Sequence, residues 1–204
     1  LYPICRSLTG NGVRQTLHRL NDVIPLVIHE VPTGTTVFDW TVPQEWNIRD
    51  AYIKNSKGDR VVDFQKSNLH VMGYSVPVSE TMSLAELLPR LYSLPEHPEW
   101  IPQRASYYKP NWGFSIAHND LVRLAEDQYE VRIDSTLSNG AMTYGECVIP
   151  GEQADEILFS THICHPSLCN DNLSGIVIAA YLAKAIAAMP KRRYTYRFLF
   201  VPAQ

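Results

Sequence analysis

The feature that most constrains the fold is a run of three apolar segments in the last quarter of the 204-residue chain. Residues 156–160 and 194–201 each have the length and composition of a buried strand. Residues 172–189, between them, have the length of a helix and are apolar on nearly every face. A strand, helix and strand of this kind are typical of a βαβ unit in a sheet covered on both faces. We therefore predict an α/β protein built around this unit.

Three more segments extend the α/β pattern. Apolar residues at helical spacing indicate a helix within residues 1–30, and Pro25 ends that pattern. Residues 129–136 and 141–149 have the composition of strands. We expect these segments to join the βαβ unit in one domain.

A β-rich module interrupts this domain. From about residue 34 the pattern changes to alternating, β-branched residues. Residues 51–54 and 60–64 flank a turn, as the two strands of a hairpin do. We therefore predict an α/β domain formed by residues 1–33 and 80–204, with a small inserted module at residues 34–79.

Composition excludes several functional classes. The formal charge is −3 and lysines and arginines are scattered, which disfavours binding to nucleic acid. No apolar run reaches the ~18–20 residues needed to span a bilayer, so no membrane association is expected. The four cysteines form no C-x-x-C pair and no signal peptide is evident. Reduced thiols in a cytoplasmic protein are the prediction, and homo-oligomerisation is left open.

The segment between the strand at 156–160 and the following helix carries the candidate chemistry. His162 leaves the strand at its carboxyl end, where ligands bind in open α/β sheets. Asp171 lies where the helix begins, and a negative charge there is stabilised by the helix dipole. An imidazole suits Zn²⁺, and a bridging carboxylate can hold two cations about 3.5–4 Å apart. These residue types suit a metal site, and the family resemblance carried by the next residues implies that His162 and Asp171 are zinc ligands.

The residues around Asp171 resemble the two-zinc aminopeptidase family, in which a zinc-binding His is followed by a bridging Asp and a Ser-Gly pair. The match is the run Asn170-Asp171-Asn172-Leu173-Ser174-Gly175. The chain also resembles a group of bacterial aminopeptidase-like proteins with an inserted β-rich domain, often encoded among polysaccharide-biosynthesis genes. That likeness covers almost the whole chain and rests on the segments at residues 3–10, 38–46, 68–70, 106–108, 112–114 and 161–167. It implies a three-layer mixed sheet of zinc-aminopeptidase type, and one or two zinc ions.

The sequence departs from the two-zinc family at two places. The family has an acidic or similar residue two positions after the first His, where this chain has Cys164. His165 follows, and it is either a further metal ligand or a partner of one. The family's general-base Glu and its neighbouring ligand Glu follow the strand at 194–201, where this chain reads Pro202-Ala203-Gln204. No catalytic residue is therefore assigned, and we expect either a truncated chain or a degenerate site.

Other interpretations of these residues stay open. His162 could simply bond to backbone, and Asp171 could act only as a helix-terminal charge. His162, Cys164, His165 and Cys169 could form a structural zinc site, although all four lie in one short loop. Cys164, beside two histidines, could also be a nucleophile.

The sequence thus supports two functions. The first is a zinc-dependent aminopeptidase-like hydrolase of a peptide or small amide substrate, with zinc bound by His162, Asp171 and, as a further candidate, His165. The alternative is a non-catalytic relative of the same fold that serves in binding or assembly, in polysaccharide biosynthesis for example. Whether the chain is an active enzyme is left open.

Overall fold

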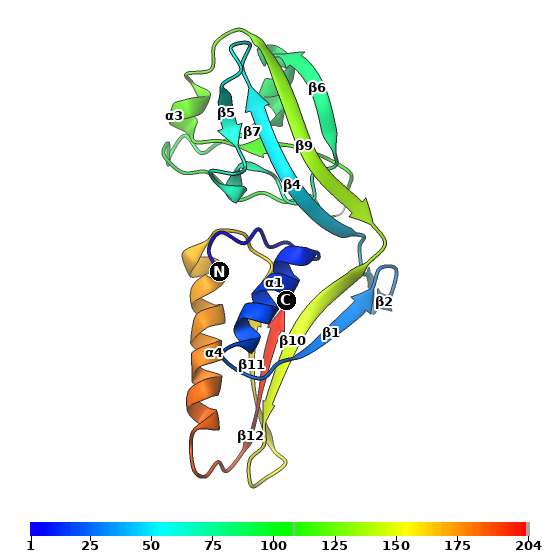
Figure 1. Cartoon of the computed structure of the whole chain (residues 1–204), viewed down its shortest axis with the longest axis vertical. Helices are drawn as coiled ribbons and strands as arrows, with labels where there is room; N and C mark the ends of the chain where they lie inside the picture. The colour runs from blue at the N-terminus through cyan, green and yellow to red at the C-terminus, as the bar shows by residue number, and fades with distance from the viewer. Residues whose placement is uncertain (108, 203–204) are drawn as a thin grey trace. The chain divides into compact units, whose positions relative to one another are not determined.

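The computed structural model describes residues 1–107 and 109–202 and divides the chain into two compact units. The first unit combines residues 1–45 with the residues from Ser138 onward, and the second unit is formed by Trp46–Leu137. Both units contain a four-stranded sheet (Figure 1). No helix among the described residues is long and apolar enough to cross a membrane.

The sheet of the first unit is mixed and contains the predicted βαβ unit. Its strand order is β1 (Val27–Pro32), β10 (Ala141–Ile149), β12 (Thr195–Val201) and β11 (Glu156–His162). The β1–β10 and β10–β12 pairs are antiparallel, whereas β11 and β12 are parallel. Helix α4 (Ser174–Ala187) connects β11 to β12, so the strand–helix–strand prediction is confirmed.

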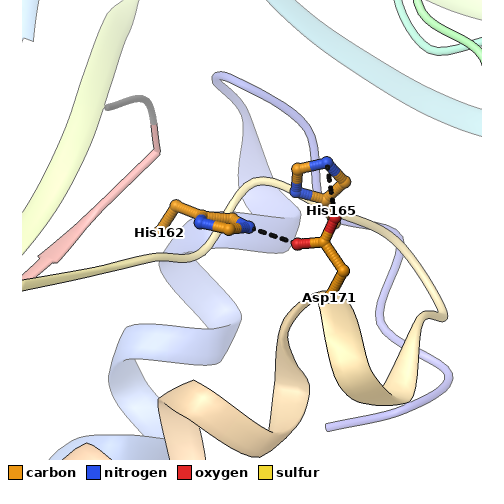
Figure 2. A group of neighbouring side chains, drawn as sticks. All are labelled: His162, His165 and Asp171. Atoms are coloured by element: carbon orange, nitrogen blue, oxygen red, sulfur yellow. Dashed lines mark hydrogen bonds and ion pairs between the residues drawn. The ribbon is translucent and has the colours of Figure 1, made fainter.

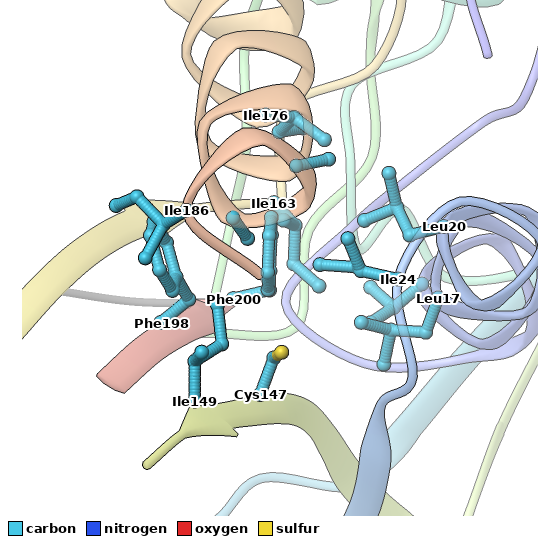
Figure 3. Packing of buried hydrophobic residues seen from close by; sticks show 13 residues of the cluster. Leu17, Leu20, Ile24, Cys147, Ile149, Ile163, Ile176, Ile186, Phe198 and Phe200 are labelled. Carbon is cyan, nitrogen blue, oxygen red and sulfur yellow. The ribbon is translucent and has the colours of Figure 1, made fainter. Parts of the chain in front are cut away.

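The core of the first unit lies between one face of this sheet and two helices, α1 (Asn11–Asn21) and α4 (Figure 3). Gly145 in β10 lets α1 approach closely, because a Cβ there would lie 2.6 Å from Cδ2 of Leu17. Since both helices share one buried cluster, the described part of this unit supplies two layers, a sheet and a helical layer. The buried residues of the cluster are Val13, Leu17, Leu20, Ile24, Cys147, Ile149, Ile163, Ile176, Ala180, Ala183, Ile186, Phe198 and Phe200.

The N-terminal segment differs from the sequence prediction. The helix occupies only Asn11–Asn21, and β1 follows it at Val27–Pro32. Residues 1–10 precede the helix without regular structure, and Gly10 enters it with a φ of 95°, a value that favours glycine. Residues 6–10 are nevertheless all buried. We refer to residues 1–10 as the N-terminal strap.

The second unit is built on a sheet with the order β5 (Arg60–Asp63), β4 (Glu45–Lys54), β9 (Gln128–Ser138) and β6 (Val78–Ser83). The antiparallel β4–β5 pair confirms the predicted hairpin. Its other elements are η1 (Asn68–His70), α2 (Leu84–Leu87), η2 (Leu88–Arg90), β7 (Leu91–Tyr92), β8 (Phe114–Ser115) and α3 (His118–Leu121).

The division into units places the insertion differently from the sequence prediction of residues 34–79. Strand β6 pairs with β9, with Val78 opposite Ile133, so residues 80–137 belong with the second unit. Residues 34–45 belong to the first unit, where β2 (Thr36–Val37) and β3 (Trp40–Thr41) form a short hairpin. The boundaries were missed because a strand pairing across 55 residues leaves no local sequence signal.

Candidate metal centre

The candidate centre lies where β11 ends and the chain turns into α4. His162 is the last residue of β11, and the chain then passes through a loop to the irregular turn η3 (Cys169–Leu173). Within η3 the backbone of Asp171 is non-helical, with φ −121° and ψ 86°, and regular helix begins only at Ser174. This interruption sets the carboxylate of Asp171 apart from the helix proper.

The structure brings His162, His165 and Asp171 together (Figure 2). Nε2 of His162 lies 2.7 Å from Oδ1 of Asp171, and Nε2 of His165 lies 3.9 Å from Oδ2 of the same carboxylate. The two imidazole rings are 4.7 Å apart between centroids and tilted by 59°. Each oxygen of Asp171 therefore faces a different histidine.

The distances among the three side chains suit a small cation. One donor atom from each residue can be chosen so that all three lie within 4.8 Å of one another. Bonds of about 2.0–2.2 Å in a tetrahedral zinc site place ligand atoms about 3.3–3.6 Å apart. The observed separations of 2.7 and 3.9 Å fall on either side of that range, so modest side-chain rotations would satisfy it.

Electrostatics of the site favour neutral imidazole at His165. Burial lowers the pKa of His165, Asp171 opposes that change, and His162 and Arg6 lower the pKa further. The side chains of His162 and His165 are each 26% exposed, and that of Asp171 is 64% exposed. A histidine binds metal through a neutral ring nitrogen, so the partial burial of His165 suits ligation.

Neighbouring residues brace the turn that carries Asp171. Nδ2 of Asn172 donates a hydrogen bond to Oγ1 of Thr161 in β11, at 2.7 Å. Gly175 allows this approach, because a Cβ there would lie 3.1 Å from the same hydroxyl. No donor among the described residues reaches the buried Oδ1 of Asn172. Buried acceptors are usually hydrogen-bonded, so this oxygen beside Asp171 fits a site that holds a further bound group.

The cysteine alternatives gain no support from this geometry. A structural zinc site of the predicted kind would require Cys164 and Cys169. The cluster found among the described residues contains neither of them. Burial raises the pKa of the Cys164 thiol to about 11, which keeps it protonated at neutral pH. A thiol in that state is a poor nucleophile, although its Sγ lies 3.6 Å from Nδ1 of His165.

Sequence reasoning missed Arg6. Its side chain is buried and hydrogen-bonded to the backbone of the loop that carries His165. The residues in contact are about 160 positions apart, so no spacing pattern could have revealed the pairing.

The fold defines a class, an α/β domain of the zinc-aminopeptidase type. A zinc aminopeptidase from Bacillus subtilis shares the fold with a TM-score of 0.56 at 11% identity, over 96% of this chain and 56% of that one. A peptidase M28 precursor from Shewanella amazonensis gives a TM-score of 0.57 at 12% identity, over 99% of this chain and 61% of that one. The prediction of a mixed α/β fold of this type is confirmed.

The particular family follows from the sequence. The chain belongs to the family described as "Domain of unknown function (DUF4910)", whose model matches residues 1–204. It is 57% identical over 202 residues to a Clostridium acetobutylicum protein named "Putative polysaccharide biosynthesis protein with aminopeptidase-like domain", covering 99% of this chain and 46% of that protein. A crystal structure of a "putative peptidase" from the same organism has a TM-score of 0.97 at 57% identity, covering 98% of this chain and 47% of that one. The chain thus spans about half the length of these relatives.

Proposed function

We propose that this chain carries the zinc-binding part of an aminopeptidase-like hydrolase that cleaves peptide or other amide bonds. The observation that carries the proposal is the convergence of His162, His165 and Asp171 at the carboxyl end of β11. The zinc-aminopeptidase type of the fold and the aminopeptidase-like domain in the name of the Clostridium protein support it.

The donor set indicates what the site would hold. Two imidazoles and one carboxylate are a common set for a catalytic zinc, which keeps its fourth position open for water or substrate. Zinc bound there would polarise a carbonyl and activate water. In that arrangement His162 and His165 would each supply Nε2, and Asp171 would supply one or both oxygens. We infer one ion from these three residues, since a second would need donors from outside the cluster.

A second candidate function comes from the name of the Clostridium relative, which places that protein in polysaccharide biosynthesis. A domain with the aminopeptidase fold could serve there as a binding or assembly module without hydrolysing amides. Metal binding alone does not separate the two functions, because a non-catalytic relative can retain its metal.

The test begins with metal content. The purified chain is loaded with zinc, desalted and analysed by mass spectrometry beside the variants His162→Ala, His165→Ala and Asp171→Ala. The matched control is His29→Ala, which removes another half-exposed histidine of the first unit, one that pairs with Glu146 outside the cluster. We expect about one zinc in the wild type and in the control, and a clear loss in the three site variants.

The second step measures hydrolysis of aminoacyl amides by zinc-loaded protein of the full length that the relatives have, because this chain spans only about half of that length. Activity that disappears in His162→Ala and Asp171→Ala supports the hydrolase. Zinc binding without hydrolysis over a panel of amides favours the binding or assembly function. A wild-type chain that retains no zinc contradicts the metal site itself.

A further inference from the structure

The N-terminal strap contributes a buried cation to the surroundings of the candidate centre. Arg6 is only 2% exposed, yet its guanidinium donates three hydrogen bonds to backbone carbonyls. Nε bonds to the oxygen of His165 at 2.8 Å, and Nη2 bonds to the oxygen of Pro166 at 2.9 Å. Nη1 bonds to the oxygen of Leu1 at 2.8 Å. One planar group therefore joins the strap to the loop that carries His165.

The type of side chain matters at this position. Arginine presents its donors in a rigid fork, whereas lysine offers a single rotatable ammonium. Nε and Nη2 bind two consecutive carbonyls, those of His165 and Pro166, so they fix the orientation of the two peptide groups that follow His165, of which the first joins it to Pro166. That peptide adjoins the Cα of His165, from which the imidazole projects toward Asp171 (Figure 2).

We propose that Arg6 is a positioning residue that holds His165 in the orientation required for binding metal. This inference rests on the proposed zinc site. Because Arg6 is buried, it acts through the loop backbone and does not contact substrate. A second contact supports the role of the strap: the hydroxyl of Ser167 donates to the oxygen of Tyr2 at 2.5 Å. The strap thus holds the loop on both sides of Pro166.

The hydrogen bonds of Arg6 do not neutralise a carboxylate. Its hydrogen-bond partners among the described residues are all carbonyl oxygens, which accept a hydrogen bond but carry no compensating charge. Burial accordingly lowers the pKa of Arg6 to about 10, against the opposing influence of the thiols of Cys5 and Cys164. Burying a guanidinium without a carboxylate costs free energy, and an apolar residue would avoid that cost. What Arg6 contributes in return is a fixed backbone geometry in the loop that carries His165.

The test is a double-mutant cycle on zinc affinity with Arg6→Lys, His165→Ala and the double variant. Zinc affinity is measured by competition with a chromogenic chelator, and the absorption spectrum of the Co²⁺-loaded chain reports the number of ligands. Loss of a residue that orients a metal ligand typically weakens binding 10- to 100-fold. We expect Arg6→Lys to weaken zinc binding about 10-fold or more and to change the Co²⁺ spectrum as His165→Ala does. In the His165→Ala background, Arg6→Lys should cause no further loss.

The matched control is Arg14→Lys, which changes another partly buried arginine of the first unit whose partners are Glu30 and Glu45. It should leave zinc affinity and the Co²⁺ spectrum unchanged. Circular dichroism of the metal-free variants checks their folding, and Arg6→Gln, which retains two N–H donors, replaces Arg6→Lys if the latter is unfolded.

Each other outcome overturns the inference. Unchanged zinc affinity in Arg6→Lys, or equal losses in both backgrounds, shows that Arg6 does not act through His165. Failure of both Arg6 variants to fold shows that Arg6 stabilises the fold as a whole. If the wild-type chain binds no zinc, the proposed metal site is refuted together with the inference. If the wild-type chain binds zinc and Arg6→Lys does not weaken binding, only the inference is refuted.

Discussion

Gly12→Ala should destabilise the first unit, although alanine is the better helix former. Gly12 lies in the first turn of α1. Replacing glycine by alanine gains at most about 1 kcal/mol, the value for the interior of a helix. Here a Cβ would lie 1.9 Å from the carbonyl oxygen of Cys5 and 2.7 Å from its carbon. Real Cβ contacts are essentially never below 3.0 Å, so strap and helix must separate by roughly 1 Å.

The magnitude follows from what must move. Both colliding groups are backbone, so no side-chain rotation relieves the contact, and residues 6–10 of the strap are buried. Overpacking of this kind costs about 1–3 kcal/mol, and here it should fall at or above the upper end. After the gain in helix propensity is subtracted, we expect a net loss of about 2 kcal/mol or more.

Hydrogen exchange read by mass spectrometry is the suitable assay, because two compact units need not unfold together. Exchange of the core amides of β10 and β12 should accelerate about 30-fold or more in Gly12→Ala. Gln15→Ala, at an exposed position of the same helix, is the control and should stay within about 0.5 kcal/mol of wild type. Slower exchange in Gly12→Ala would refute the reasoning, because helix propensity would then outweigh the contact with Cys5.

Three further predictions concern the core, an ion pair and the cysteines. Leu17→Ala, at a fully buried position, should cost about 2–5 kcal/mol in the same exchange assay, and a loss below 1 kcal/mol would contradict the packing described. The guanidinium of Arg14 holds the pKa of Glu30 below its ordinary value, against the effect of burial. The ion pair stabilises the fold above the ordinary glutamate pKa, and this stabilisation is lost as the pH falls through the lowered pKa that Glu30 has in the folded protein. Arg14→Met should therefore flatten the acid side of the curve of stability against pH, and an unchanged curve would count against this account. Iodoacetamide at pH 8 should modify the exposed Cys169 before the buried Cys164, whose pKa is raised to about 11, and rapid labelling of Cys164 in the folded chain would revive its role as a nucleophile.

Elements with local signals could be predicted from the sequence. The β4–β5 hairpin was indicated by two β-rich segments around a turn, and the structure pairs Tyr52 with Asp63. Ser83 and Glu86 form a capping box at the start of α2, each bonding to the other's backbone N–H. The β11–α4–β12 unit was evident because each segment is apolar enough to be buried. In these cases the determining residues are within one element or its neighbours.

The N-terminal strap shows why other parts could not be predicted. Residues 1–10 have an ordinary composition, and the helical pattern predicted within residues 1–30 did not set them apart from the helix that follows. What sets their conformation is contact with distant segments: Arg6 with His165 and Pro166, and Ser167 with Tyr2. These contacts pair backbone carbonyls of the strap and of the distant loop, and no pattern within residues 1–10 encodes them.

The candidate centre also combines features with a local sequence signal and features set by distant contacts. His162, His165 and Asp171 lie within ten residues, so a sequence pattern could nominate all three. Their relative orientation depends on the interruption of η3 at Asp171 and on the strap, neither of which the spacing encodes. A sequence can thus show that residues able to bind metal are present. The orientation that they need for binding depends, in the proposal made above, on Arg6 near the other end of the chain. Arg6→Lys changes that geometry without changing any candidate ligand, and it therefore separates the presence of the ligands from their preorganisation.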